Sequence, residues 1–140
     1  MSNKFMATKI IQFALIVSLV IYGVVIVIVT QQQSEQFTPL LDDFMRIVLS
    51  SIGLMMYPLA FMIHRMWITP SKLKDKDQPL SFFITTHIIV WAIFEAGSVC
   101  GLVMGFLTHD LYDYIPFAIL SIIGILTHSA SEDKFNRLMT

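Results

Sequence analysis

The sequence predicts an all-α membrane protein with four transmembrane helices arranged as two hairpins, and three observations support this fold class. The chain of 140 residues is 56% hydrophobic and only 14% charged, with a mean hydropathy of +0.73. A water-soluble core of this size cannot bury so much apolar surface. The apolar residues gather in four long stretches, and the basic residues fall almost entirely on one side of them. We therefore expect one transmembrane domain over residues 1–140.

Each predicted span is an apolar run bounded by polar or charged residues. The approximate limits of the four spans are 10–30, 44–66, 81–107 and 114–129. Crossing the hydrocarbon takes about 20 helical residues, so the second and fourth spans include residues that flank their shorter apolar runs at 47–63 and about 115–126. The first run ends at Thr30 and a run of glutamines without a small-residue cleavage site. It therefore indicates an uncleaved anchor rather than a secretory signal.

Local signals agree with these boundaries. Thr38 followed by Pro39 predicts the start of the second helix, because Thr caps helix N-termini and Pro is favoured at the first helical position. The stretch from Asp113 to Pro116 gives a similar signal before the fourth span. The residues at about 67–80 contain prolines and several lysines, which predicts a cytoplasmic loop.

The basic residues predict the orientation. Eight of the nine Lys and Arg residues lie before the first span, around the loop at 67–80, or after the fourth span, and only Arg46 lies on the opposite side. Short loops rich in Lys and Arg stay in the cytoplasm, so we expect the N-terminus and the C-terminus to be cytoplasmic. We expect the protein to be surrounded by lipids in the bacterial inner (cytoplasmic) membrane.

The two halves of the chain show a weak internal similarity. Gly23 in the first span aligns with Gly101 in the third, and the segment IVLSSIG at 47–53 matches AILSIIG at 118–124. Apolar segments match easily by chance, which leaves a duplication open. Two such hairpins would be parallel repeats, related by an axis along the membrane normal.

Glu95 is the side chain that bears most directly on function, because it falls at the midpoint of the third span, which contains no Lys or Arg. A charged side chain at that depth costs about 2.5–3.5 kcal/mol on insertion scales, so the carboxyl must be protonated, paired or in contact with water. It either binds a proton or, as a neutral acid, hydrogen-bonds a neighbouring helix. Ser98, one turn away, and His87, about 12 Å along the axis, are candidate supporting residues.

Small residues repeat at four-residue spacing along the same span, and such GxxxG patterns let helices approach closely. At about 100° per residue, the three glycines lie about 200° to 280° around the helix from Glu95. We expect one face to pack against a helix, in this chain or in another copy, while another face presents the acid. The residues predicted to pack are Ala92, Ala96, Gly97, Gly101 and Gly105, with Gly23 and Gly53 on other spans.

The stretch from Trp91 to Leu107, WAIFEAGSVCGLVMGFL, resembles the carboxylate-bearing helix of the rotary ATPase proteolipids, the c subunits of the membrane ring. The resemblance implies a proton or sodium ion bound at Glu95 and self-association into an oligomer or ring. The chain departs from that family in lacking a GxGxGxG inner helix and in carrying its carboxylate on the first helix of a hairpin rather than the second.

No motif indicates an enzyme. The phosphate-binding GxxxxGK[ST], GxGxxG, HExxH, CxxC and GxSxG patterns are missing from the sequence. The four histidines lie near different helix ends, and their spacing predicts neither a metal nor a haem site. We expect no cofactor and no nucleic-acid partner.

These observations lead to two hypotheses. The first is a non-enzymatic, proteolipid-like subunit in which Glu95 binds or translocates a proton within a homo-oligomer or with other membrane subunits. The alternative is a structural or accessory subunit of a larger membrane complex, with no transport of its own. A small transporter ranks below both, because Pro58 is the main sign of a broken helix.

Overall fold

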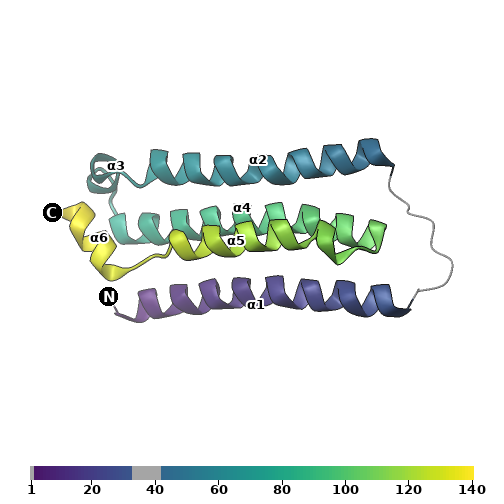
Figure 1. Cartoon of the computed structure of the whole chain (residues 1–140). Helices are drawn as coiled ribbons and strands as arrows, with labels where there is room; N and C mark the ends of the chain where they lie inside the picture. The colour runs from purple at the N-terminus through teal and green to yellow at the C-terminus, as the bar shows by residue number, and fades with distance from the viewer. Residues whose placement is uncertain (1, 33–41) are drawn as a thin grey trace.

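The computed structural model describes residues 2–32 and 42–140, and every regular element in these residues is helical (Figure 1). The elements in chain order are α1 (Ser2–Gln32), α2 (Asp43–Trp67), α3 (Pro70–Lys74), α4 (Pro79–Thr108), the 3-10 helix η1 (Leu111–Asp113), α5 (Ile115–Thr127) and α6 (Glu132–Met139). The capping signal expected at Thr38 and Pro39 lies outside the described residues.

Three helices are long and apolar enough to cross a membrane, namely α1, α2 and α4. They contain the predicted spans at 10–30, 44–66 and 81–107, and the all-helical prediction is confirmed. The helix α1 begins at Ser2, well before its predicted span. Helical hydrogen bonding extends into the polar residues before the apolar run, whereas the apolar pattern marks only the run itself.

The fourth predicted span, 114–129, is divided in the structure. The helix α5 has 13 residues, which cover about 20 Å of the about 30 Å hydrocarbon core. The helix α6 follows after a short break. The segments Leu111–Thr127 and Glu132–Met139 are bent by 55° relative to each other, and they make a fourth candidate span only if they count as one. Ser131 starts the new helix by accepting a hydrogen bond from the Lys134 backbone N–H over 3.2 Å.

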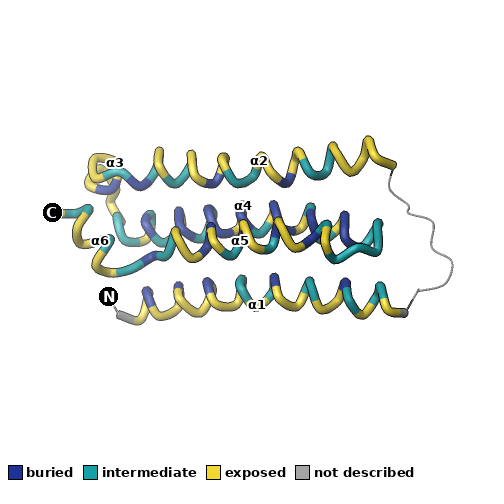
Figure 2. Tube along the Cα trace, in the orientation of Figure 1, coloured by how far each residue is buried: buried dark blue, intermediate teal, exposed yellow. Residues whose placement is uncertain are grey.

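The helix α4 is the centre of the bundle and packs against α1, α2 and α5. Figure 2 shows buried positions on successive turns of α4, whereas α1 and α2 are largely exposed on their outer sides. Phe83, Val90 and Trp91 of α4 are completely buried. A helix that is apolar all round can receive neighbours on several sides, which explains its central place.

The helices α1 and α2 lie on opposite sides of α4 and α5 (Figure 1). They do not pack along each other as the hairpin expected from the sequence; each packs on α4 instead. The outward faces of α1 and α2 carry many exposed Ile, Val, Leu, Met and Phe side chains. Such rows of exposed apolar side chains suit lipid as the surrounding solvent.

Both chain ends and α3 lie at the same end of the bundle (Figure 1). This end, which we call the basic end, carries eight basic residues, which lie near the start of α1, in the last turn of α2, in the α2–α4 connection and on α6. Arg46, near the start of α2, lies at the opposite end. The expected loop at 67–80 contains α3 and the first residues of α4.

Candidate functional site

The candidate site is built around Glu95, which lies near the middle of the 30-residue helix α4. Its side chain is half-buried where α4 meets α1. On the same helix, Gly97 is buried, whereas Ile93 is half-buried like Glu95. The carboxyl group therefore sits at the edge of the bundle rather than at its centre.

Two hydroxyl groups of α1 bind the carboxyl group. Ser18 Oγ lies 2.9 Å from Glu95 Oε1, and the Tyr22 hydroxyl donates to the same oxygen over 3.3 Å. Ser18 and Tyr22 are four residues apart, so a single face of α1 presents both groups to α4. These hydrogen bonds join two helices at the depth of the acid.

Ser18 can serve either protonation state of Glu95. Its Oγ is also 2.7 Å from the backbone oxygen of Leu15, and a hydroxyl has only one hydrogen to donate. When Glu95 is ionised, Ser18 donates to the carboxylate. When Glu95 is protonated, the carboxyl O–H can donate to Ser18 Oγ while Ser18 donates to Leu15. The same atoms therefore accommodate the group with or without its proton.

No basic side chain of the described residues pairs with Glu95. The one ion pair within residues 2–32 and 42–140 joins Arg46 Nη2 to Asp113 Oδ1 over 2.8 Å. Thr108 also donates to Asp113, over 2.7 Å, so this network ties α2, α4 and η1 together at the end opposite the basic end. A negative charge on Glu95 would be met by hydroxyl dipoles and not by a cation.

The two candidate supporting residues lie elsewhere. Ser98 is completely buried, and its hydroxyl donates to the Tyr114 hydroxyl over 3.4 Å. His87 is also completely buried, and its Nδ1 lies 2.8 Å from the backbone oxygen of Phe83. The partners of Glu95 are Ser18 and Tyr22 and not Ser98, while His87 lies about 12 Å away along α4, as expected from the sequence.

The glycines of α4 face aromatic or bulky side chains of this chain. A Cβ at Gly97 would come within 3.1 Å of Tyr57, and one at Gly101 within 2.8 Å of Phe117. At Gly105 it would come within 2.9 Å of Ile26. The glycine stripe is therefore filled by helices α1, α2 and α5 of the same molecule.

The remaining small residues divide between buried and exposed positions. Gly53 on α2 is buried, and a Cβ there would lie 2.7 Å from Phe117, whereas one at Gly23 on α1 would be at an ordinary 3.4 Å from Tyr114. Ala92 and Ala96 are exposed on the outer side of α4. Their packing against another helix stays a prediction.

Sequence reasoning missed three contributors. Ser18 and Tyr22 are polar positions at four-residue spacing in an apolar helix, a signal that would have marked a polar face on α1. Gly124 on α5 is the third, since a Cβ there would lie 2.5 Å from the ring of Phe94. Gly124 ends the segment AILSIIG, which is similar to IVLSSIG at 47–53, but this similarity does not show which side chain packs against the glycine.

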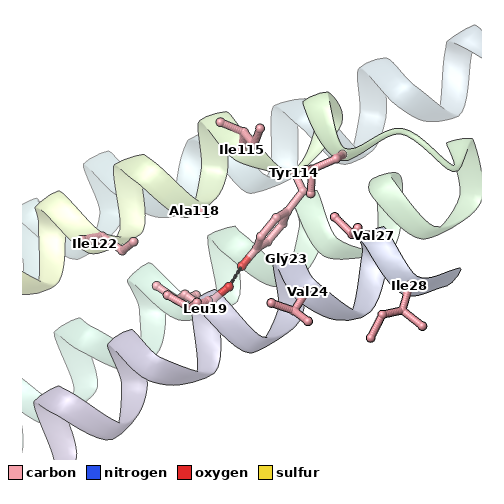
Figure 3. A pocket seen from close by; sticks show the side chains of 11 residues that line it. Leu19, Gly23, Val24, Val27, Ile28, Tyr114, Ile115, Ala118 and Ile122 are labelled. Carbon is pink, nitrogen blue, oxygen red and sulfur yellow. Dashed lines mark hydrogen bonds between the residues drawn. The ribbon is translucent and has the colours of Figure 1, made fainter. Parts of the chain in front are cut away.

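An apolar groove of about 400 Å³ runs between α1 and α5 (Figure 3). Leu19, Gly23 and Val24 line it from α1, and Tyr114 and Ile122 from the other side. Figure 3 shows the Tyr114 side chain crossing toward α1, where its hydroxyl donates to the Leu19 backbone oxygen over 2.6 Å. Glu95 does not line this groove, which is almost entirely apolar.

Among the described residues, no group of three or more His, Cys, Asp or Glu side chains is arranged to hold a metal ion. A single carboxyl group such as that of Glu95 can form hydrogen bonds and exchange a proton. No protein-family model, curated protein or solved structure matches this chain.

Proposed function

We propose that this chain is a proteolipid-like membrane subunit in which Glu95 binds a proton at mid-membrane within an oligomeric complex. The observation that carries the proposal is a half-buried carboxyl group at the middle of α4, hydrogen-bonded by Ser18 and Tyr22, with no cation paired to it in the described chain. Hydroxyl donors offset only part of the cost of a charge at that depth. A bound proton removes that cost.

The position of Glu95 also suits exchange. The side chain is half-buried, and the neighbouring Ala92 and Ala96 are exposed, so a water-filled path or a neighbouring subunit can reach the carboxyl group from outside the bundle. Ser18 accepts or donates as the proton leaves or arrives. The glycine stripe is already filled, so the proposed oligomer would use the outer faces of the helices rather than that stripe.

The proposal includes an orientation. Both termini and α3 lie at the basic end of the bundle, which we place in the cytoplasm of a bacterial cell by the positive-inside rule. The end with Arg46 and Asp113 then faces outward. In this orientation, the bent pair of α5 and α6 makes the fourth crossing, with the C-terminal end of α6 on the cytoplasmic side.

A second candidate function is an accessory subunit that holds a larger membrane complex together. The observation that favours it is that both partners of Glu95 come from α1 of the same chain. In this case Glu95 is a permanently neutral acid that joins α1 to α4. Native mass spectrometry in mild detergent separates the two, since the first predicts a homo-oligomer and the second predicts one or a few copies among unlike chains.

Replacing Glu95 by Gln tests proton binding directly. Glutamine keeps the size and hydrogen-bonding capacity of the side chain but cannot bind or release a proton. In proteoliposomes, we expect Glu95→Gln to abolish both proton flux and labelling by a hydrophobic carbodiimide. The matched control is Glu132→Gln, which removes an exposed carboxyl group on α6. Unchanged flux and labelling in Glu95→Gln would refute the proposal.

A further inference from the structure

Three histidines that are far apart in the sequence meet near the basic end of the bundle. His64 comes from α2, His87 from α4, and His128 follows the last residue of α5. The ring centroids of His64 and His87 are 5.2 Å apart, and those of His64 and His128 are 4.5 Å apart, both edge to face. We call these three residues the histidine trio. His64 stands between the other two rings.

Hydrogen bonds determine which nitrogens of the outer rings carry hydrogen. His87 Nδ1 is 2.8 Å from the Phe83 backbone oxygen, and His128 Nδ1 is 2.9 Å from the Gly124 backbone oxygen. A carbonyl oxygen can only accept, so Nδ1 must be the donor in both rings. In a neutral imidazole the other nitrogen, Nε2, then bears a lone pair. Two rings therefore present acceptors.

The trio contains unused hydrogen-bonding capacity. Nε2 of His64 and Nε2 of His87 are buried and have no hydrogen-bond partner among the described residues. Leaving a buried polar atom unsatisfied costs about 1–3 kcal/mol. His87 is completely buried, so water does not relieve its nitrogen in the isolated chain. The site is therefore built to hold something that supplies hydrogen-bond donors.

The surroundings favour a small cation over an anion. The ring of Phe83 lies 4.3 Å from that of His87, and the rings of Phe61 and Phe94 lie 6.0 Å and 5.3 Å from that of His128. Aromatic rings within about 6 Å attract a positive charge. The trio does not have the arrangement of a metal site. A proton is the cation that fits.

We propose that the histidine trio is a second proton-binding site, in which one added proton on His64 is shared with Nε2 of His87 or His128. A neutral His64 has one N–H and one lone pair, whereas the protonated ring has two N–H groups, so either of its nitrogens can then donate to a neighbouring lone pair. The new N–H to N bond forms between rings of different helices. Binding the proton therefore fastens α2 either to α4, through His87, or to the end of α5, through His128.

The charged groups around the trio set the condition for binding. Lys134 of α6 acts electrostatically on all three rings of the trio, and His128 acts on the other two. No carboxylate of the described residues forms an ion pair with the trio. Burial lowers the pKa of Lys134 below its ordinary value, which lessens but does not remove its opposition to a second positive charge. The site is therefore expected to fill on acidification rather than at neutral pH.

This inference does not rest on the proposed role of Glu95, because Glu95 lies eight residues after His87 on α4, at a distance of about 12 Å along the helix. The test uses the full chain in lipid nanodiscs with histidine labelled by ¹⁵N. At neutral pH, we expect two rings with hydrogen on Nδ1. On acidification, we expect a ¹⁵N–¹⁵N coupling across a hydrogen bond between two rings. Three rings that titrate with no coupling would overturn the proposal.

Two variants assign the coupling. His64→Phe keeps an aromatic ring but removes the shared proton, so the coupling should be lost. His109→Gln changes a histidine outside the trio and should leave it intact. A coupling that persists in His64→Phe would contradict the proposal. Because the first measurement uses the unmodified chain, failure of His64→Phe to fold would not remove the test.

Fluorescence of Trp91 gives an independent readout. The Trp91 ring is 6.3 Å from that of His87, and its Nε1 donates to the His128 backbone oxygen over 3.0 Å. In a Trp67→Phe background, we expect acid to change the Trp91 signal reversibly, and the change to be lost on adding His64→Phe. If Zn²⁺ at neutral pH produces the same change, and a chelator reverses it, the occupant is a metal and the proton proposal is wrong.

Discussion

Glu95 and Ser18 show how a carboxyl group is accommodated on an otherwise apolar helix. The acid has two hydroxyl partners, and one of them can reverse the direction of its hydrogen bond. Its position at the midpoint of the third span predicted from the sequence that Glu95 bears on function. Its partners could not be predicted, because Ser18 is separated from Glu95 by 77 positions and the contact depends on how α1 rotates against α4.

Replacing Ser18 by Ala should weaken the junction of α1 and α4. The loss removes one donor to the carboxyl group, worth about 0.5–1.5 kcal/mol if Glu95 is neutral and about 1.5–3 kcal/mol if it is charged. A double-mutant cycle with Glu95→Gln, measured by unfolding in detergent, gives the coupling free energy. Ser51→Ala is the control, since the exposed Ser51 hydroxyl donates to the Ile47 backbone oxygen in its own helix. Equal losses in Ser18→Ala and Ser51→Ala would count against the contact.

At the scale of elements, aromatic side chains fit into gaps left by glycines. Phe117 of α5 fills the space beside Gly101 of α4 and Gly53 of α2, and Phe94 of α4 fills the space beside Gly124 of α5. Small residues let helix backbones approach, and the aromatic rings then occupy the gap. The GxxxG pattern predicted close packing, but a single sequence does not reveal whether the partner is aromatic or is in the same chain.

Gly101→Ala should destabilise the bundle, because the new Cβ would lie 2.8 Å from Cβ, Cγ and Cδ2 of Phe117, atoms close to the α5 backbone that cannot swing away. The expected loss is about 1–3 kcal/mol in thermal unfolding in detergent. Gly23→Ala is the matched control.

At Gly23 the nearest atom would be at 3.4 Å, an ordinary contact. Alanine is the better helix former by about 0.5–1 kcal/mol, so this change should be neutral or stabilising. Equal destabilisation by the two alanines would mean that the glycines matter for their backbone freedom and not for packing.

On the scale of the whole molecule, the sequence predicted most of the helices and little of their arrangement. Long apolar runs identify α1, α2 and α4 because each must be about 20 residues to cross the hydrocarbon. The predicted fourth span contains a break. The apolar run of α5 is too short to cross the hydrocarbon, and the polar residues near Ser131 begin a new helix. The placement of α1 and α2 on opposite sides of α4 depends on packing between distant segments, which periodicity does not encode.

The orientation can be read by labelling single cysteines with a membrane-impermeant thiol reagent in intact cells. In a Cys100→Ala background, Tyr112→Cys should react from outside, because Tyr112 is exposed at the end opposite the basic end. Asn136→Cys on α6 should react only after the cells are opened. The reverse pattern would place the basic end outside and refute the proposed topology.

We propose that Glu95 takes up and releases a proton within the membrane. Infrared difference spectroscopy of the reconstituted protein, recorded between acidic and basic pH, detects this change at the carboxyl group itself. We predict a carboxylic-acid C=O band that appears on acidification in the unmodified chain and in Glu132→Gln, and that is missing in Glu95→Gln. Spectra that are identical in the unmodified chain and in Glu95→Gln would contradict the claim.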